Sequence, residues 1–263
     1  MLLVVLHGGP GAPGSAVGLA VALAGFGSVL EPWQRRAGSV PLTVDRHVAG
    51  LAEVLSSPTV IVGWSWGAML GLSFAVVRPE LVRSLVLVGC GTYDEESRQA
   101  YGKRMAERLA EDERTELVRI SRQLEATADR PTRDRLFAQM GRVAARAQAV
   151  ELLEPPAAVE ADADGYSETW ADVLERQRRG VEPAAFAAIS CPVLMIHGAD
   201  DPHPGPATRD VLRHHLPRLE YIEIPRCGHE PWLERHGREP FLAAVRAWLE
   251  RLDASVGGEP SRV

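Results

Sequence analysis

The sequence is poor in lysine and carries more acidic than basic residues, which argues against a nucleic-acid-binding protein. Lys103 is the only lysine among 29 basic residues, and 35 acidic residues give a net charge of −6. The pI near 5.8 leaves no strongly basic surface of the kind that reads phosphates. The arginine bias is typical of a GC-rich coding sequence and does not indicate a phosphate site. We therefore expect no nucleic acid among the partners.

Cysteine and long apolar runs are also scarce. The three cysteines, Cys90, Cys191 and Cys227, are far apart and odd in number, so they fit no metal site. No His/Glu pair has zinc-protease spacing. No apolar run reaches the ~18 residues of a membrane helix, and the apolar N-terminus lacks the basic flank of a signal peptide. We expect a cytoplasmic protein with reduced thiols, no cofactor, no metal and no membrane partner.

What the chain does have is a serine between glycines, at the junction of a strand and a helix. Residues 59–62 are apolar and β-branched, residues 63–67 read Gly-Trp-Ser-Trp-Gly, and residues 68–77 suit a helix. This order is that of a nucleophile elbow, whose turn strains Ser65 and exposes its hydroxyl. The two glycines lack the Cβ atoms that would collide there. The alternative is a plain turn in which Ser65 has no chemical role.

A second glycine-rich segment follows the first expected strand. Residues 2–6 form a continuous apolar run, consistent with a strand buried on both faces, and residues 7–11 read His-Gly-Gly-Pro-Gly. Backbone N–H groups of such a loop can face a ligand. Gly9 and Trp66, which directly follows the serine, are the expected donors of an oxyanion hole. An ordinary Gly/Pro turn is the alternative for this loop.

The remaining pattern alternates strands and helices, with one long helical insertion. Further strands are expected at residues 28–30, 84–88, 191–196 and 219–224. Residues 94–180 are charged and helical in spacing, which indicates an inserted lid. We predict an α/β fold with about six mostly parallel strands flanked by helices. The core comprises residues 1–91 and 184–254, the helical lid residues 92–183, and a flexible tail residues 255–263.

A serine nucleophile needs a base, and the base needs an orienting carboxylate. In a fold of this type they follow the serine in the order acid, then histidine, on loops after later strands. Asp201 and His229 occupy such positions. Asp200 is the rival acid, but Asp201 lies three residues after a glycine, the usual spacing. His203, on the same loop, could line the pocket, although we expect it at the surface.

These residues resemble the α/β-hydrolase superfamily over about residues 2–252. The His-Gly-Gly-Pro-Gly and Gly-Trp-Ser-Trp-Gly segments are similar to the group that contains proline iminopeptidases and related small-molecule hydrolases. The resemblance implies an eight-stranded, mostly parallel sheet with a helical cap after the sixth strand. It also implies Ser65 as nucleophile, Asp201 as acid and His229 as base. Epoxide hydrolases and haloalkane dehalogenases carry aspartate at the nucleophile position, so Ser65 argues against both.

The chain departs from that group at its N-terminus, where an expected hairpin of about two strands is missing. Either the sheet is trimmed to about six strands or the start codon is misassigned. The strand at residues 2–6 would then either have an unpaired edge or be covered by something else, and exposed edges invite pairing with another chain. A homodimer is therefore possible.

The substrate is expected to be a small molecule, because a helical lid covers the entrance. Trp64 and Trp66 either wall the pocket or pack in the core. Iminopeptidases hold the substrate amine with cap carboxylates, for which Glu168 and Glu175, near Trp170, are the candidates. We name Trp64, Glu168 and Trp170 as substrate-binding residues.

We rank ester or lactone hydrolysis through an acyl-enzyme first, a prolyl-type aminopeptidase second and carbon–carbon hydrolysis third. A catalytically silent ligand-binding protein on the same fold is the alternative of another class.

Overall fold

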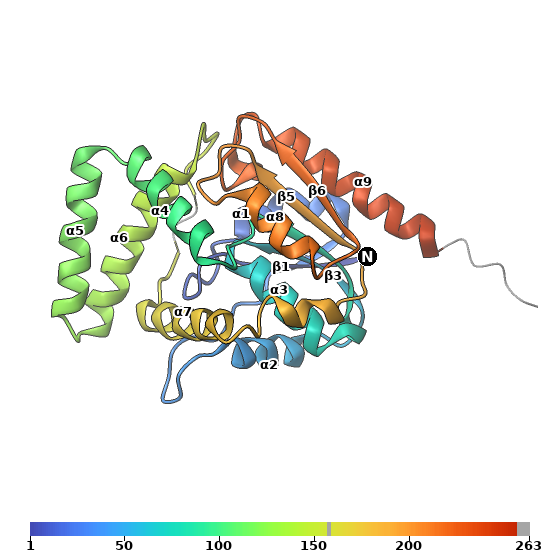
Figure 1. The fold of residues 1–263 in the computed structure, drawn as a ribbon, viewed down its shortest axis with the longest axis horizontal. Coiled ribbons are helices and arrows are strands. Elements are labelled where there is room, and N and C mark those ends of the chain that lie inside the picture. Colours follow the sequence, from blue (N-terminus) through green and yellow to red (C-terminus); the bar gives the residue numbers. More distant parts are fainter. Residues whose placement is uncertain (157–158, 257–263) are drawn as a thin grey trace, which may run out of the picture.

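The computed structural model describes residues 1–156 and 159–256, and these form a six-stranded parallel sheet with helices on both faces (Figure 1). The strand order is β2-β1-β3-β4-β5-β6. The strands are β1 (Leu2–Leu6), β2 (Ser28–Leu30), β3 (Thr59–Trp64), β4 (Val82–Val88), β5 (Val193–Gly198) and β6 (Leu219–Ile224). The helices around the sheet are α1 (Val17–Leu23), α2 (Val44–Val54), α3 (Trp66–Val77), α8 (Gly205–Arg213) and α9 (Arg238–Val256). The predicted α/β fold and its six strands are confirmed.

The central strands are apolar throughout because both faces of the sheet are covered. Alternate residues of β1 enter different clusters: Val4 and Leu6 pack with α2 and α3, whereas Leu3 and Val5 pack with α1 and α9. This explains why a continuous apolar run, with no polar alternation, marks each buried strand. All six strands are parallel, so their carboxyl ends lie at one edge of the sheet, where loops can bring distant residues together.

Of the two alternatives for the edge at residues 2–6, the unpaired edge is wrong, because β2 covers it. β1 pairs with β3 on one side and with β2 on the other, where Leu2 lies opposite Ser28. The chain crosses over through α1 and returns parallel, so the edge of the sheet is the three-residue β2. A short edge strand offers few free backbone groups to another chain. The homodimer expectation rested on β1, and it stays a prediction.

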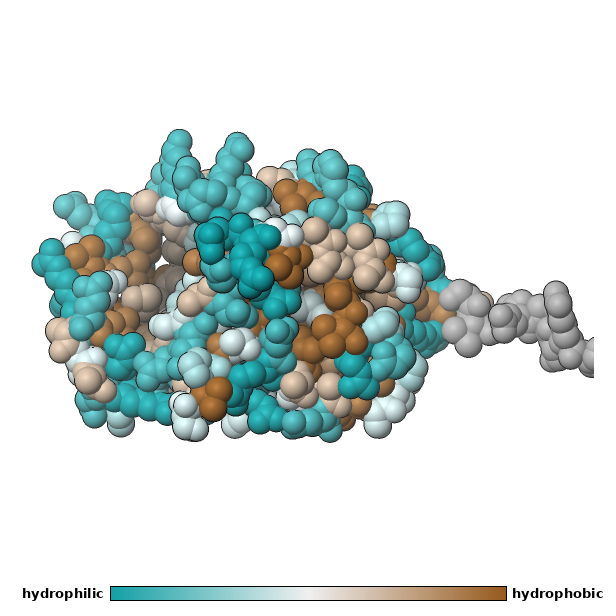
Figure 2. All heavy atoms as spheres, turned by 60° about the horizontal axis from the view of Figure 1, so that its bottom comes forward, coloured by the Kyte–Doolittle hydropathy of each residue, from teal (hydrophilic) through white to brown (hydrophobic). Residues whose placement is uncertain are grey.

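Four helices lie between β4 and β5 in the sequence and stand over the carboxyl edge of the sheet (Figure 1). They are α4 (Glu95–Arg108), α5 (Glu111–Ala126), α6 (Arg130–Gln148) and α7 (Ala163–Arg178), and we call them the lid. α4, α6 and α7 each begin after an aspartate, Asp94, Asp129 or Asp162, whose carboxylate accepts a backbone N–H three residues on. The molecule is hollowed beside α5, at the left of Figure 2.

The lid is fastened to the core at the end of α6. Gln148 O accepts the backbone N–H of His229 at 3.1 Å, and the N–H of Leu153 donates to Leu233 O at 2.8 Å. Both core partners belong to the segment after β6. The lid therefore shares backbone hydrogen bonds with one of the loops at the carboxyl edge.

In the described ranges, no helix combines the length and the apolar character that crossing a membrane requires. Residues 257–263, most of the expected flexible tail, lie outside those ranges.

Candidate active site

Ser65 occupies a strained turn between β3 and α3. Its backbone has φ 53° and ψ −116°, a region that non-glycine residues rarely adopt. A Cβ on Gly63 would lie 2.3 Å from Gly67 O, and one on Gly67 would lie 2.2 Å from Leu6 O. The two glycines are thus required by the close approach of strand and helix, as the sequence predicts. The turn is held by Ser65 N–H, which donates to Val88 O at 2.8 Å.

Asp201 and His229 meet on neighbouring loops at the carboxyl edge. Asp201 follows β5 and His229 follows β6, and His229 Nδ1 lies 2.7 Å from Asp201 Oδ2. Both side chains are almost fully buried. The rival Asp200 is exposed, and its backbone N–H donates to Cys227 O. The carboxylate that reaches the histidine is therefore that of Asp201.

The two groups shift each other's pKa. Burial by itself would raise the pKa of Asp201, but the imidazoles of His229, His197 and His203 outweigh burial and hold it well below its usual range. Burial disfavours the charged form of His229, yet the adjacent Asp201 carboxylate outweighs this and raises the pKa of His229. The pair thus combines an ionised acid with an imidazole that accepts a proton readily.

The Ser65 hydroxyl is half-exposed and makes no hydrogen bond to a described residue. The ring of His229 packs against Trp64, with 5.6 Å between ring centroids, and the indole N–H of Trp64 donates to His229 O at 3.2 Å. In ligand-free hydrolases the serine–histidine contact often tightens only when substrate binds. Within the described residues, therefore, no partner occupies the Ser65 hydroxyl.

Two backbone N–H groups near Ser65 have no acceptor among the described residues. Trp66 opens α3, where the first N–H groups of a helix have no intrahelical partner. Gly9 has φ +53° in the loop after β1, and its N–H is likewise unused. These are the two donors that the sequence suggests for an oxyanion hole.

The two tryptophans at the elbow have different surroundings. Trp66 is buried, lies edge-on to His47 and donates its indole N–H to Gln34 at 2.7 Å, as a core residue does. Trp64 is half-buried between His229 and Trp232. Only Trp64 lies against the expected base.

The lid residues singled out for amine binding already have other partners. Glu168 accepts the backbone N–H of Leu42 at 2.8 Å, and Glu175 pairs with Arg178. Trp170, also half-buried, stacks parallel to Tyr166 with 6.4 Å between ring centroids. Glu168 thus ties α7 to the segment before α2.

His203 is the residue that the sequence reasoning misplaced. Its side chain is 14% exposed and lies in the site, not at the surface. Its Nδ1 is 3.0 Å from Asp201 Oδ1, and its ring stacks on that of His229 at 4.6 Å. The opposite face of the ring stacks on Tyr101 of α4 at 4.2 Å. The position of His203, two residues after the acid, was the one available signal.

Asp201, His203 and His229 also have ligand atoms within 4.8 Å of one another, as a metal site would. Each Nδ1 is within hydrogen-bonding distance of the ionised Asp201 carboxylate, so each carries a proton. A metal at these atoms would have to displace both protons and would break the bonds that hold the two imidazoles to Asp201. The arrangement therefore fits a hydrogen-bonded acid–base pair better than a metal site.

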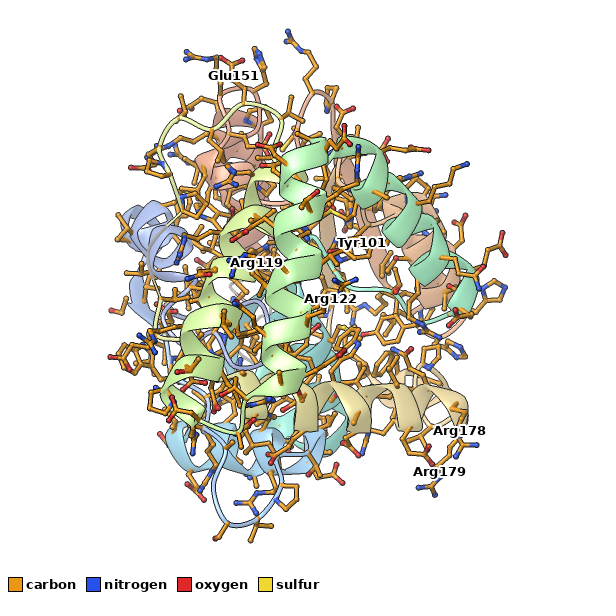
Figure 3. All side chains as sticks on the ribbon, turned by 90° about the vertical axis from the view of Figure 1, so that its left-hand side faces the viewer. Tyr101, Arg119, Arg122, Glu151, Arg178 and Arg179 are labelled. Carbon is orange, nitrogen blue, oxygen red and sulfur yellow. The ribbon has the colours of Figure 1, made fainter. Side chains whose placement is uncertain are left out.

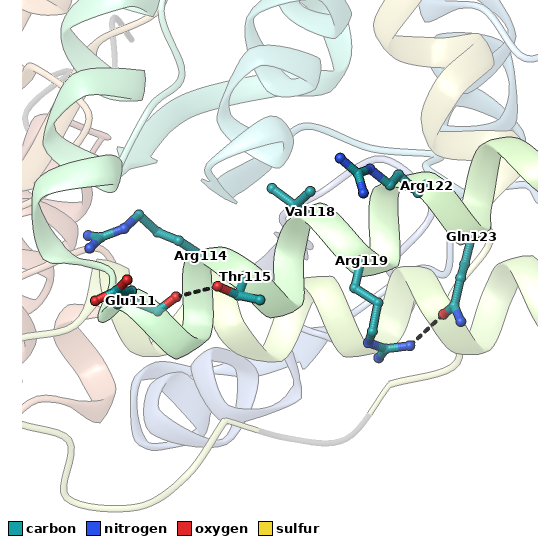
Figure 4. A pocket seen from close by; sticks show the side chains of 7 residues that line it. All are labelled: Glu111, Arg114, Thr115, Val118, Arg119, Arg122 and Gln123. Atoms are coloured by element: carbon teal, nitrogen blue, oxygen red, sulfur yellow. Dashed lines mark hydrogen bonds between the residues drawn. The ribbon is translucent and has the colours of Figure 1, made fainter.

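A cavity of about 550 Å³ runs along α5, away from these residues (Figure 4). Its lining residues are Glu111, Arg114, Thr115, Val118, Arg119, Arg122 and Gln123. Figure 3 looks onto the lid and labels Arg119 and Arg122 on α5. Neither Ser65 nor His229 lines this cavity, so it is separate from the residues described above.

Comparison with known proteins agrees with this architecture. A model of the Alpha/beta hydrolase family matches residues 3–244. A pimeloyl-[acyl-carrier protein] methyl ester esterase of Nitrosomonas europaea is 26% identical over 199 residues, which are 73% of this chain and 72% of the relative.

Two solved structures share the fold. Proline iminopeptidase of Mycobacterium smegmatis has a TM-score of 0.62 at 23% identity and covers 97% of this chain and 91% of its own. A thermophilic esterase of Thermogutta terrifontis, with malate bound, has a TM-score of 0.61 at 19% identity and covers 96% and 90%. With the family model matched over nearly the whole length, the chain belongs to the alpha/beta hydrolase family and is an enzyme, a hydrolase.

Proposed function

We propose that this enzyme cleaves a small-molecule carboxylic ester or lactone through an acyl-enzyme. Ser65 is the nucleophile, His229 the general base and Asp201 the carboxylate that orients it. The observation that carries the proposal is the 2.7 Å contact between His229 Nδ1 and Asp201 Oδ2, with the His229 ring packed on Trp64, the residue before the strained Ser65. A base held by a carboxylate and set next to a serine is the arrangement that activates a hydroxyl.

In the first step His229 Nε2 takes the Ser65 proton as the hydroxyl oxygen attacks the ester carbonyl. The negative charge that develops on the carbonyl oxygen is met by the unused N–H groups of Trp66 and Gly9. The imidazolium then gives its proton to the departing alcohol, which leaves the acyl group on Ser65. Water, deprotonated by His229, attacks the acyl-enzyme and releases the acid.

Asp201 supports this cycle because it favours the imidazolium that forms in each half-reaction. Its carboxylate is buried and ionised, with a pKa held well below the usual range by the surrounding imidazoles despite burial. The low local dielectric makes that support larger than it would be in water.

Ester cleavage is favoured over removal of an N-terminal residue by the state of the lid carboxylates. An aminopeptidase must hold a cationic amine, but Glu168 is engaged by Leu42 N–H and Glu175 by Arg178. The relative from Nitrosomonas europaea is named a methyl ester esterase, which supports the same choice. Trp64 and Trp170, both half-buried, are the aromatic residues we assign to substrate contact.

The Ser65→Ala variant tests the proposal. Removing the nucleophile should reduce kcat for p-nitrophenyl butyrate by about 10⁴-fold or more. A fluorophosphonate probe should label the wild-type enzyme and leave the variant unlabelled. Normal turnover by Ser65→Ala would overturn the assignment, and a folded wild type that neither turns over nor labels would indicate a catalytically silent protein.

A parallel assay with proline p-nitroanilide separates the two substrate classes. We expect kcat/KM for the ester to exceed that for the anilide. A preference for the anilide, lost in Glu168→Gln, would show instead that the lid carboxylate serves an amine.

A further inference from the structure

The Asp201 carboxylate is shared among three imidazoles. Oδ2 lies 2.7 Å from His229 Nδ1 and 3.1 Å from His197 Nε2. Oδ1 lies 3.0 Å from His203 Nδ1 and accepts the backbone N–H of His203 at 2.8 Å. Each oxygen thus has two partners, and a carboxylate with four partners has little freedom to rotate.

His203 is clamped between the lid and the base. One face of its ring stacks on His229, with centroids 4.6 Å apart and planes 22° apart. The other face stacks on Tyr101 of α4, with centroids 4.2 Å apart and planes 27° apart. Tyr101, seen among the lid side chains in Figure 3, accepts a hydrogen bond at its hydroxyl from Gln148 Nε2 at 3.0 Å. Lid helix, His203 and His229 therefore form one continuous stack.

The proton positions on His203 follow from its partners. Asp201 can only accept, so His203 Nδ1 carries the hydrogen that joins them. Burial lowers the pKa of His203 and outweighs the nearby carboxylate, so the ring stays neutral. His203 is thus a neutral donor to the oxygen that His229 does not use.

We propose that His203 is a positioning residue: its Nδ1–H bond fixes Asp201, and its ring, pressed by Tyr101, fixes the plane of His229. The inference rests on the proposed function for its catalytic meaning. A hydrogen bond from a neutral donor also draws charge from the carboxylate, and so tempers the support that Asp201 gives to the imidazolium of His229.

The withdrawal of charge from Asp201 by His203 changes the pKa of His229 in a definite direction. Without the His203 bond, the full carboxylate charge acts on His229, and the pKa of His229 rises. Because the neutral form of His229 is the base, the acid limb of kcat/KM then moves to higher pH.

Other ionisable groups face Asp201 and His229 from several elements. The substitutions in the test below do not change these groups. They are His197 on β5, Glu230 and Glu234 on the loop of His229, and Arg104 and Arg108 of α4, which donate to the backbone carbonyls of Asp201 and Asp200.

His203→Phe removes the hydrogen bond and keeps a flat ring in the stack. We expect the acid limb for p-nitrophenyl butyrate to rise by about half to one pH unit, and the plateau kcat to fall about 10-fold with little change in KM. His214→Phe is the matched control, because His214 is exposed at the end of α8 and, among the described residues, its ring bonds only Asp210 O. A His203→Phe profile that coincides with that of His214→Phe would overturn the proposal.

Two variants of Tyr101 test the stack separately. Tyr101→Phe keeps the ring and loses only the bond from Gln148, so its kcat should stay near that of the wild type. Tyr101→Ala removes one side of the clamp and should lower kcat several-fold at unchanged KM. Equal kcat values for the two variants would contradict a role for stacking.

An NMR titration of the imidazole protons gives a readout that does not need turnover. We expect the pKa of His229 to be higher in His203→Phe than in the wild type, by the same shift of about half to one unit. If His203→Phe unfolds, His203→Asn keeps a side-chain donor without the ring and should leave the pKa of His229 nearer the wild-type value. An unchanged pKa of His229 in a folded His203→Phe overturns the inference even if the ester is not a substrate, whereas loss of Ser65 dependence overturns only the proposed function.

Discussion

At the scale of single residues, the turn at Ser65 depends on glycines, which have no Cβ atom. Gly67 lies where a Cβ would come within 2.2 Å of Leu6 O, which is backbone and cannot rotate away. The strained conformation of Ser65 exists because the surrounding strand and helix leave the chain no alternative.

We predict that Gly67→Ala destabilises the protein by about 3 kcal/mol or more, since either β1 or α3 must shift. Urea unfolding measures the difference. Gly102→Ala is the control, because Gly102 lies on the exposed face of α4 with nothing within 4 Å of a new Cβ. That variant should gain about 0.5–1 kcal/mol from helix propensity. Equal effects of the two substitutions would show that the close contact at Gly67 does not limit stability.

Glu230, next to the base, carries a buried carboxyl that titrates near neutrality. Its pKa is raised to about 7, mainly by burial. The attraction of His229 lowers the pKa by less than burial raises it, and the nearby Glu234 raises it further. Because the folded pKa lies above that of the unfolded chain, the contribution to stability is fully present below about pH 4.5 and is lost as the pH rises through 7.

Glu230→Gln should therefore stabilise the protein at pH 8 relative to the wild type, by about 3 kcal/mol at most, and have little effect at pH 4.5. Thermal and urea unfolding at the two pH values give the comparison. Glu96→Gln, on the exposed start of α4, provides the reference. The account fails if the gain from Glu230→Gln is the same at both pH values.

At the scale of elements, Asp162 joins the lid to the segment before α2. Its fully buried carboxylate accepts the N–H of Gly165, in the first turn of α7, and the N–H of Ala37 at 2.6 Å. Arg130 of α6 approaches it at 3.3 Å. One side chain thus holds two lid helices and a core loop together.

We expect Asp162→Ala to cost about 2–4 kcal/mol, because it removes a helix cap and leaves buried donors without an acceptor. Limited proteolysis should then cut the segment of residues 31–43 faster. Asp164→Ala is the matched control, since Asp164 lies in the helix that Asp162 caps and, in the part of the chain that the structure describes, pairs only with Arg133. Its effect should stay below about 1 kcal/mol. Similar proteolysis of the two variants would indicate that the loop is held by other contacts.

At the scale of the whole molecule, the sequence predicts what local chemistry determines and misses what distant segments create. The sequence locates all six strands within about two residues of their observed ends. Continuous apolar runs mark β1, β3, β4 and β5, because strands buried on both faces admit few polar residues, whereas β6 shows the alternation of a partly exposed strand. Which strands pair with β1 could not be predicted in this way. β2 returns parallel to β1 after the crossover through α1, and no local sequence pattern indicates that pairing.

The same division holds in the active site. The glycines around Ser65 and the acid–histidine order are local patterns, and the contact of Asp201 with His229 follows from parallel strands that end at one edge. The environment of His203 depends on Tyr101, about one hundred residues earlier in the chain, and stacking of this kind has no sequence period. The partner of Glu168, the backbone N–H of Leu42, was hidden for the same reason, whereas Glu175 pairs with Arg178 three residues on, at ordinary helical spacing.

The attachment of the lid has a consequence for protein engineering. Gln148 and Leu153 bond the backbone of the segment that carries His229, and Tyr101 presses on the acid loop. The lid is therefore not an interchangeable module. A chimera that takes its lid from a relative, to import a new specificity, would change the pocket. It would also lose the contacts through which this lid holds His229 and the Asp201 loop in place. Splice points placed inside the lid, which leave Tyr101 and residues 148–153 with this core, would separate the two.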